Sequence, residues 1–339
     1  MDNTLQRSIE VYSTCPQSVE AEGADYLKKV RDVARWSEGY GCKGILVYAD
    51  NRLADPWLIA QFIIQNTVAL CPLVAVQPVY MHPYAAATMV SSLGHMYGRR
   101  ICLNMIAGGF KNDLTALNDA TPHDKRYHRL VEYTLIIKRL LESSTPVSFD
   151  GEFYKIANVK LLPTLRPDLL PEVFVSGSSE AGQEAARAMN ATAVHYPRPP
   201  AEYTDDGENG RKDSGIRIGI IARHSEEDAW SIAQTRFPAD RKGEITRDLA
   251  TKVSDSVWHK QLSRLADYAE EGRSPYWMVP FETYKTNCPY LVGSYARVAE
   301  EVSRYVKAGH TKFILDIPPS EEELHHTAAV FDQVTNGIR

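Results

Sequence analysis

The sequence predicts an α/β fold, a (β/α)8 TIM barrel with insertions, because short apolar runs alternate with amphipathic helical stretches along its 339 residues. There are eight runs and eight helical stretches, and eight βα units close a barrel, whereas an open doubly wound sheet usually has about five to seven strands. Several runs are apolar at almost every position, which is typical of parallel strands buried on both faces. No G-x-G-x-x-G follows the first run, which argues against a Rossmann domain.

The predicted strands are short and apolar, and the predicted helices repeat apolar residues at helical spacing. The strands are Ile9–Thr14, Gly44–Ala49, Leu73–Gln77, Ile101–Ala107, Glu172–Gly177, Thr192–Tyr196, Ile216–Ala222 and Lys312–Ile317. The helices are Ala24–Gly39, Pro56–Thr67, Pro83–Tyr97, Lys125–Glu142, Glu180–Met189, Glu226–Arg236, Tyr295–Lys307 and Glu321–Val334. We expect the helices to cover the outside of the barrel.

Three segments interrupt the repeat, and we expect them to be insertions in a single domain that spans the whole chain. Residues 144–170 contain Asp150-Gly151 at the centre of a β-rich stretch, which predicts a hairpin with a type I′ turn. Residues 199–214 are polar and contain Gly and Pro, which predicts a mobile surface loop. Residues 239–293 begin as a helical arm and end in an aromatic stretch, Ser274–Tyr295, for which an active-site lid and a packing arm or oligomer contact are both open.

The composition excludes several classes of function. With 43 acidic and 38 basic residues the net charge is −5, whereas a nucleic-acid or anionic-membrane binder needs clustered Lys and Arg. No apolar stretch approaches about 18 residues, so we expect no membrane span. The sequence starts without the pattern of a signal peptide, and its five cysteines are scattered without a C-x-x-C. We therefore expect a cytoplasmic protein without a disulfide framework.

A TIM barrel works at the carboxyl ends of its strands, so residues there are the first candidates for a site. The stretch Ser176–Ala186 runs from a predicted strand directly into a helix. Its small residues let the backbone approach an anion, and the free N–H groups of the first helical turn favour a phosphate. A plain serine N-cap without a ligand is the alternative. No cluster of His, Asp and Glu appears at ligand spacing near the strand ends, so we expect no metal site.

A second candidate is the helix start within Thr121–Leu130, where Thr121 is the expected N-cap and Pro122 the first helical residue. His123 and Tyr127 are four residues apart, so they share one face at the helix mouth and offer hydrogen bonds to a ligand. An ordinary helix start is the alternative, since a His and a Tyr at such a position are common.

Together these two stretches resemble a known family. The H-x-x-R-Y of His123–Tyr127, GEFY at Gly151–Tyr154, KLLP at Lys160–Pro163 and GSSEAG at Gly177–Gly182 follow in the order found in the bacterial luciferase-like, flavin-dependent monooxygenases. The resemblance is to the alkanesulfonate and nitrilotriacetate monooxygenase-like branch in particular. It extends to LVAVQP at Leu73–Pro78, LNMIAGG at Leu103–Gly109 and EEDAW at Glu226–Trp230, and so covers most of the chain.

The resemblance implies an FMN-binding barrel in which reduced FMN, supplied by a separate flavin reductase, reacts with dioxygen to form a C4a-(hydro)peroxide that oxygenates an organic substrate. It also implies a homodimer or homotetramer. Position by position it implies these cofactor contacts: Asp50 beside the flavin, a non-proline cis peptide at Ala75–Val76 beneath the ring, Ala107 at its edge, His123 and Tyr127 at the phosphate or ribityl region, and Ser178 and Ser179 at the phosphate.

The departures from the family pattern concern the substrate. Where the sulfonate-oxidising members carry Arg-x-His in strand seven, this sequence has Arg217-Ile218-Gly219. The other anchors of those enzymes, a Cys, a Trp, a Tyr and a His, fall on Leu53, Tyr196, Ile317 and Pro319. We therefore expect an organic substrate that is not a simple alkanesulfonate. A biosynthetic intermediate presented on a carrier protein is one candidate.

The candidate catalytic residues lie at the ends of late strands. Arg217 is expected to attract an anionic substrate or to stabilise the peroxide, with Lys285 of the aromatic stretch as a weaker candidate, since an exposed lysine is usually only solvated. His195 and Tyr196 end the sixth predicted strand and are expected to contact the substrate. A packed His–Tyr pair is the alternative.

Two other functions stay open at this point. Related barrels use the deazaflavin F420 for hydride transfer, so an F420-dependent oxidoreductase is one of them. The other is a flavin-binding relative that has lost catalysis and stores or senses flavin, because most of the sulfonate anchors are missing.

Overall fold

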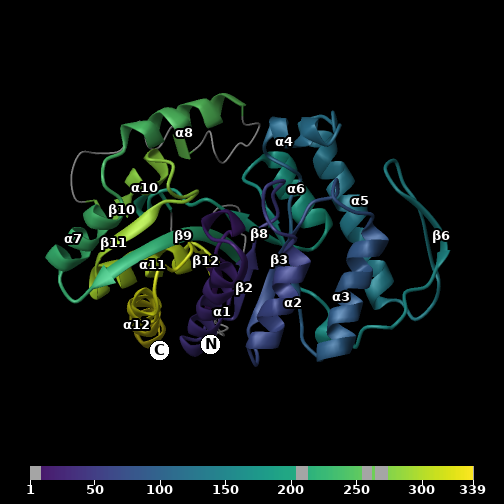
Figure 1. Ribbon diagram of the computed structural model, residues 1–339, viewed down its shortest axis with the longest axis horizontal. Coiled ribbons are helices and arrows are strands. Elements are labelled where there is room, and N and C mark those ends of the chain that lie inside the picture. Colours follow the sequence, from purple (N-terminus) through teal and green to yellow (C-terminus); the bar gives the residue numbers. More distant parts are fainter. Residues whose placement is uncertain (1–8, 204–212, 254–261, 264–273, 339) are drawn as a thin grey trace, which may run out of the picture.

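The structure is a computed structural model that describes residues 9–203, 213–253, 262–263 and 274–338. Eight parallel strands close into a barrel with helices around its outside, so the predicted TIM barrel is confirmed (Figure 1). The barrel strands are β1 (Glu10–Thr14), β2 (Gly44–Val47), β3 (Cys71–Val76), β4 (Cys102–Met105), β7 (Val173–Ser176), β8 (Thr192–His195), β9 (Ser214–Arg223) and β12 (His310–Leu315). The main helices are α1 (Gly23–Gly39), α2 (Pro56–Asn66), α3 (Pro83–Tyr97), α4 (Lys111–Ala116), α5 (His123–Glu142), α6 (Glu180–Ala188), α7 (Glu226–Arg236), α11 (Tyr295–Lys307) and α12 (Glu321–Ile338).

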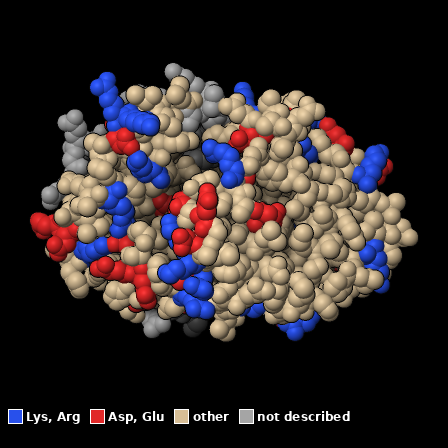
Figure 2. Space-filling model, in the orientation of Figure 1, with Lys and Arg blue, Asp and Glu red and all other residues tan. Residues whose placement is uncertain are grey.

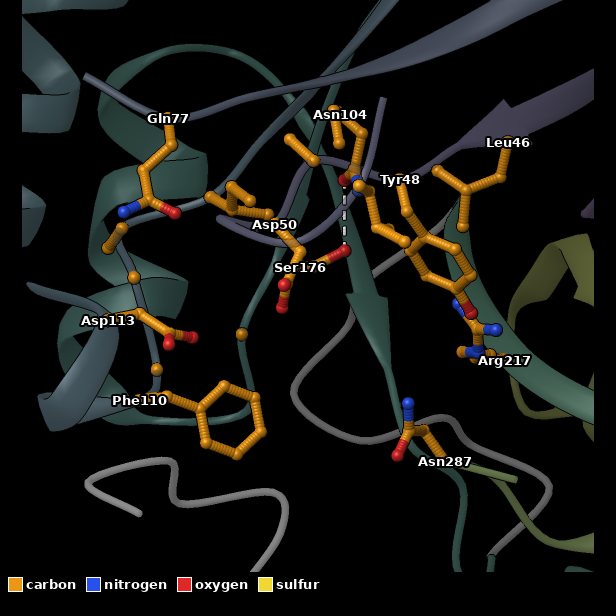
Figure 3. A pocket seen from close by; sticks show the side chains of 18 of the residues that line it. Leu46, Tyr48, Asp50, Gln77, Asn104, Phe110, Asp113, Ser176, Arg217 and Asn287 are labelled. Carbon is orange, nitrogen blue, oxygen red and sulfur yellow. Dashed lines mark hydrogen bonds between the residues drawn. The ribbon is translucent and has the colours of Figure 1, made fainter. Parts of the chain in front are cut away.

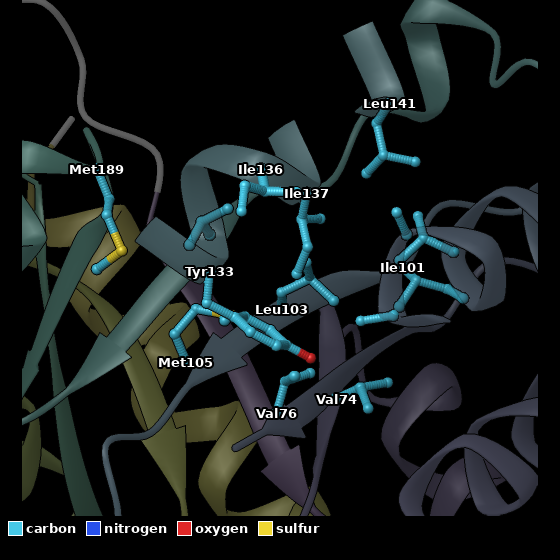
Figure 4. Close-up of a cluster of buried hydrophobic side chains, with 14 of the residues drawn as sticks. Val74, Val76, Ile101, Leu103, Met105, Tyr133, Ile136, Ile137, Leu141 and Met189 are labelled. Carbon is cyan, nitrogen blue, oxygen red and sulfur yellow. The ribbon is translucent and has the colours of Figure 1, made fainter. Parts of the chain in front are cut away.

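Side chains of the barrel strands alternate between its inside and its outside, because successive residues of a strand point to opposite faces. Leu73 and Phe174 are among the fully buried side chains that fill the inside. Val74 and Val76 point outward and pack against helical residues such as Tyr133 (Figure 4). No helix among the described residues is both long and apolar enough to cross a membrane.

The barrel closes where β8 pairs with β9, with Val194 opposite Gly215 and His195 opposite Ile216. On its other side β9 pairs with β12, where Arg217 lies opposite Ile314. Strand β9 has ten residues, and only its first half takes part in these two pairings. The second half therefore extends beyond the barrel wall.

The extension of β9 pairs in parallel with β11 (Tyr290–Ser294), which pairs antiparallel with the short β10 (Tyr276–Trp277). The same part of the chain forms α8 (Arg241–Val253) and α10 (Val279–Glu282), which lie beside each other at the top of Figure 1. The sequence pattern missed β11 as a strand, because a short apolar stretch does not reveal its distant partner. The rest of the predicted helical arm lies outside the described residues, as does most of the predicted 199–214 loop.

The predicted hairpin forms from β5 (Val147–Asp150) and β6 (Lys155–Val159), but the predicted type I′ turn at Asp150-Gly151 is wrong. Four residues, Gly151–Tyr154, connect the two strands. The reason is Glu132 of α5, whose carboxylate accepts hydrogen bonds at 2.8–3.2 Å from the backbone N–H groups of the three residues after Gly151. Gly151 N donates to Tyr154 O at 3.0 Å, so the chain turns at Glu152-Phe153 and not at Asp150-Gly151.

The start of α5 is held by Asp119 in the loop before it. The Asp119 carboxylate accepts hydrogen bonds from Arg129 Nη2 at 2.6 Å and from the N–H and hydroxyl of Thr121 at 3.1 and 2.6 Å. The predicted N-cap role of Thr121 is therefore wrong: α5 begins at His123 with Pro122 at the cap position, and the threonine hydroxyl is already donated to Asp119. Burial alone would raise the pKa of Asp119, but the hydrogen bonds from arginine and threonine lower it to about 2.

Asp119→Asn is expected to destabilise the fold in a pH-dependent way. Because the folded pKa of about 2 lies below the ordinary value of 3.8, the carboxylate contributes stability that is full above pH 3.8 and is lost as the pH falls through 2. The contribution is on the order of 2 kcal/mol at neutral pH, and roughly half of it remains at pH 3. Urea unfolding of both proteins at pH 7 and pH 3 measures it. Asp168→Asn, at an exposed carboxylate 3.1 Å from Arg166, is the matched control. A wild-type advantage that does not change with pH contradicts the role.

Candidate active site

A cavity of about 540 Å³ opens at the carboxyl ends of the barrel strands, a size typical of small-molecule sites. Side chains from the ends of β2, β3, β4, β7, β8 and β9 line it, and Tyr284–Asn287, which follow α10, also line it. Figure 3 shows Asp50 on one side of the cavity and Tyr48 with Arg217 on the other. The cavity therefore has two polar ends with different chemistry.

Tyr127 of α5 packs against the turn between β7 and α6 at one end of the cavity. Ser179 is the N-cap of α6, where its Oγ accepts from Gly182 N at 3.1 Å, and its side chain also hydrogen-bonds Tyr127. A Cβ on Gly177 would lie 2.6 Å from Tyr127 Oη, and one on Gly182 would lie 3.2 Å from it, so these glycines make room for the phenol. Burial raises the pKa of Tyr127, so the phenol keeps its proton at neutral pH.

Two further groups at this end are placed to meet a ligand. Ser178 Oγ is buried and has no hydrogen-bond partner within the part of the chain that the structure describes. His123 lies one turn before Tyr127 with the two rings edge to face at 5.3 Å, and its Nδ1 is 2.7 Å from Asp124 Oδ1. The first turn of α6, with its partial positive charge, starts at the same place. We call Gly177–Ser179 together with His123 and Tyr127 the phosphate cradle.

The wall beside the phosphate cradle is acidic. Asp50, just after β2, accepts from Arg52 Nε at 3.1 Å. Asp113 of α4 lines the same wall, and burial together with the negative charge of Asp50 raises its pKa. Ala107, after β4, also lines the cavity, and its methyl group leaves room for a flat ring to approach the backbone. The structure thus places Asp50 and Ala107 on the wall of the cavity, and it adds Asp113.

The opposite end is built around Arg217, which projects from β9 with a side chain that is 5% exposed. Its guanidinium carbon lies 4.9 Å from the centre of the Tyr48 ring, and its Nη2 lies 3.6 Å from Asp316 Oδ1. Tyr290 Oη donates to Asp316 Oδ2 at 2.8 Å. Among the described residues, Arg217 Nε and Nη2 have no hydrogen-bond acceptor. We call Arg217, Tyr48, Asp316 and Tyr290 the arginine cluster.

The other titratable groups near the arginine cluster are not reactive at neutral pH. Burial, together with Asp316, raises the pKa of Tyr196 and the pKa of the Cys288 thiol well above their ordinary values. Both groups are therefore protonated, so neither acts as a base or a nucleophile. Lys285 lines the cavity, but its Nζ lies 2.6 Å from Asp240 Oδ2, so its charge is already balanced.

Val76 does not reach the cavity with its side chain, which corrects its predicted place beside the cofactor. It packs against the helices outside the barrel, while its neighbours Ala75 and Gln77 line the cavity (Figure 4). The predicted cis peptide at Ala75–Val76 is also wrong, since the one cis bond among the described residues joins Leu162 and Pro163.

His195 is the second predicted residue that the structure places elsewhere. Its neighbours point inward, Val194 into the barrel and Tyr196 into the cavity, so His195 points outward. Its ring lies 6.0 Å from that of His310, edge to face. His195 therefore lies outside the cavity that Tyr196 lines, and we remove His195 from the candidate catalytic residues.

Several cavity residues were not among the predicted site residues. Ser176 Oγ donates to Asn104 Oδ1 at 2.9 Å in the middle of the cavity, and Gln77 and Tyr48 lie on either side of them (Figure 3). Each is the inward-facing residue at or just beyond the carboxyl end of a strand. Strand phase would have identified them, whereas a search for catalytic motifs passes over Asn, Gln and Ser.

A family model described as luciferase-like monooxygenase matches residues 10–312. The chain belongs to this family. It is therefore an enzyme, an oxidoreductase, and a flavin-dependent monooxygenase.

Among known proteins, the 4-(gamma-L-glutamylamino)butanoyl-[BtrI acyl-carrier protein] monooxygenase BtrO of Niallia circulans is 34% identical over 338 residues, which cover 98% of each chain. The solved EDTA monooxygenase from Chelativorans sp. BNC1 has the same fold, with a TM-score of 0.72 at 15% identity over 98% of this chain and 95% of that one. A solved F420-dependent secondary alcohol dehydrogenase has a TM-score of 0.67 at 17% identity, over 96% of this chain and 99% of that one.

The residues of the phosphate cradle fit the phosphate of a flavin mononucleotide. Ser178 Oγ is a buried polar atom without a partner, Tyr127 has a protonated phenol, and α6 supplies the first-turn N–H groups that favour an anion. Gly177 leaves room for the Tyr127 phenol at this place, because a Cβ there would lie 2.6 Å from Tyr127 Oη. Among the described residues, no group of three or more His, Cys, Asp or Glu side chains is arranged so that it could hold a metal ion.

Ser178→Ala is expected to weaken FMN binding about tenfold, because it removes one hydrogen bond to a charged phosphate. Binding of riboflavin, which has no phosphate, should not change. The melting temperature should also stay the same, since Ser178 Oγ has no partner to lose among the described residues. Flavin fluorescence titrations measure both affinities.

The control for this variant is Ser225→Ala, which removes the N-cap hydrogen bond to Asp228 N at the start of α7. It should lower the melting temperature and leave FMN affinity unchanged. Equal losses for FMN and riboflavin in Ser178→Ala would show that the serine does not contact a phosphate.

Proposed function

We propose that this chain is a two-component monooxygenase that takes reduced FMN from a separate flavin reductase and oxygenates an acyl substrate attached to an acyl-carrier protein. The observation that carries the proposal is a single cavity with the phosphate cradle at one end and the arginine cluster at the other. The substrate class is supported by 34% identity, over 98% of both chains, to a monooxygenase whose name specifies a substrate on an acyl-carrier protein.

The roles of the chain's own residues follow from their positions. When bound, reduced flavin supplies the electrons for dioxygen, so that one oxygen atom enters the substrate and the other leaves as water. The phosphate cradle holds the cofactor by its phosphate and so fixes where its ring lies. Tyr284–Asn287 border the cavity and reduce the access of water. Arg217 donates hydrogen bonds to the substrate from Nε and Nη2.

The test combines the purified protein with a flavin reductase, NADH and FMN, and compares three forms of one acyl group: the free acid, the pantetheine thioester and the acyl-carrier protein thioester. Mass spectrometry should detect the gain of one oxygen atom, fastest for the carrier-bound form. Replacement of FMN by F420 should abolish the product.

Three results would contradict parts of this proposal. Turnover with F420 and not with FMN would favour an F420-dependent oxidoreductase. Tight FMN binding without any oxygenated product would favour a relative that has lost catalysis. Equal rates for the free acid and the carrier-bound form would remove the carrier protein from the proposal and leave the monooxygenase.

We also propose that the chain forms a homodimer or homotetramer through α2 and α3. These two neighbouring helices contain no Asp, Glu, Lys or Arg. Leu58 of α2 is 66% exposed and Met96 of α3 is 56% exposed. The lower right of Figure 2, over these helices, carries few charged side chains. An uncharged face with exposed apolar side chains suits contact with an identical face.

Leu58→Glu is expected to shift the protein to a smaller assembly, because it places a charge inside the proposed interface. Light scattering after size-exclusion chromatography measures the mass. Leu249→Glu, at a leucine of α8 that is 59% exposed, is the matched control and should not change the mass. A wild-type protein that elutes as a monomer excludes the interface.

A further inference from the structure

We infer that the arginine cluster selects a neutral carbonyl oxygen of the substrate, as in an amide or a thioester, over an anionic carboxylate or sulfonate. This inference rests on the proposed function, since it names the substrate group that the same cavity receives. The guanidinium of Arg217 is buried, and its Nε and Nη2 lack hydrogen-bond acceptors among the described residues. Buried donors need acceptors, so this end of the cavity is built to receive an oxygen atom.

Asp316 determines which kind of oxygen fits there. Its Oδ1 lies 3.6 Å from Arg217 Nη2 and its side chain is 13% exposed, so the two form a buried ion pair without net charge. A carboxylate or sulfonate bound to Arg217 would be a second anion beside the Asp316 carboxylate, removed from water and uncompensated. A carbonyl oxygen provides lone pairs to Nε and Nη2 without adding that charge. The expectation that Arg217 attracts an anion is thereby revised.

No second cation on the cavity wall is left to balance an added anion. Of the described residues that line the cavity, the lysines and arginines are Arg217, Arg52 and Lys285. Arg52 Nε lies 3.1 Å from Asp50 Oδ1, and Lys285 Nζ lies 2.6 Å from Asp240 Oδ2. Each of these cations therefore has its own carboxylate, and none of them is left to balance an anion added at the arginine cluster.

Gly219 and Tyr290 show how the counter-charge of Arg217 is fixed in place. Gly219 lies opposite Tyr290 in the pairing of β9 with β11, and a Cβ on Gly219 would collide with the Tyr290 ring. The hydroxyl of the same tyrosine holds Asp316. The Tyr290 ring can therefore occupy its observed place only if residue 219 has no side chain. We assign Gly219, Tyr290 and Asp316 as positioning residues that act through Arg217.

The experiment measures binding in the absence of turnover. Three ligands of similar size serve as probes: butanamide is neutral, whereas butanoate and propane-1-sulfonate are anionic. Their dissociation constants are measured by NMR titration of the protein, with and without oxidised FMN. The variants are Asp316→Asn, Tyr290→Phe and Arg217→Met. Glu172→Gln makes the same charge change beside Arg100, before the start of β7, and is the matched control.

We expect wild type and Glu172→Gln to bind butanamide at least threefold more tightly than either anion. Asp316→Asn should reverse this order, because it leaves Arg217 with an uncompensated charge: the anions should gain about tenfold, and butanamide should change less than twofold. Tyr290→Phe should shift the ratio in the same direction by a smaller factor, since Asp316 keeps its charge and loses its hydrogen bond. Arg217→Met should weaken all three ligands and remove the preference.

Tighter binding of either anion than of butanamide by the wild type would overturn the inference. An unchanged order in Asp316→Asn would overturn it as well, provided that the variant melts within about two degrees of the wild type. Both readouts are independent of reduced flavin and dioxygen. A failure of the proposed function would appear as absent oxygenation, and a failure of this inference would appear as the wrong ligand order.

Discussion

Two residue pairs close the barrel: Val194 lies opposite Gly215, and His195 lies opposite Ile216. Because β8 and β9 meet there, the turn after β7 and the side chain of Arg217 come to the same mouth. Without this pairing the sheet would stay open, and the phosphate cradle and the arginine cluster would lie at separate places along its edge. The closure therefore sets the separation of the two polar ends, and with it the length of ligand that reaches both.

The two ends of the cavity suit ligand groups of different charge. The phosphate cradle offers hydrogen-bond donors: the Ser178 hydroxyl, the protonated Tyr127 phenol and the first turn of α6, whose partial positive charge favours an anion. It can therefore receive a formal anion. The arginine cluster contains a formal cation whose charge is already balanced by Asp316. It therefore has hydrogen-bond donors for a ligand but no net positive charge. A ligand pair that is charged at one end and neutral at the other matches this arrangement.

The barrel and the phosphate cradle were predictable because their signals are local. Buried parallel strands appear as apolar runs, and the serines after β7 occur within one short stretch. The outward positions of the Val76 and His195 side chains were not predicted, because the order of motifs does not specify which face of a strand a side chain takes. The counter-charge of Arg217 could not be predicted either, because Tyr290 of β11 and Asp316, just after β12, lie far along the sequence from Arg217 of β9. Only the folded sheet brings a cation and its carboxylate together.

Strand β9 takes part in two separate sets of strand pairings. Its first half is bound into the barrel by β8 and β12, and its second half carries β11 and, through it, Tyr290. An exchange of residues in the outer strand pair would leave the pairings of β9 with β8 and β12 in place. Such an exchange would change which chemical groups the enzyme accepts, because it removes or replaces the tyrosine that steadies the acid next to Arg217. The junction of β9 with β11 is therefore a place where a change of sequence alters the surroundings of Arg217 and leaves the pairings of the barrel strands unchanged.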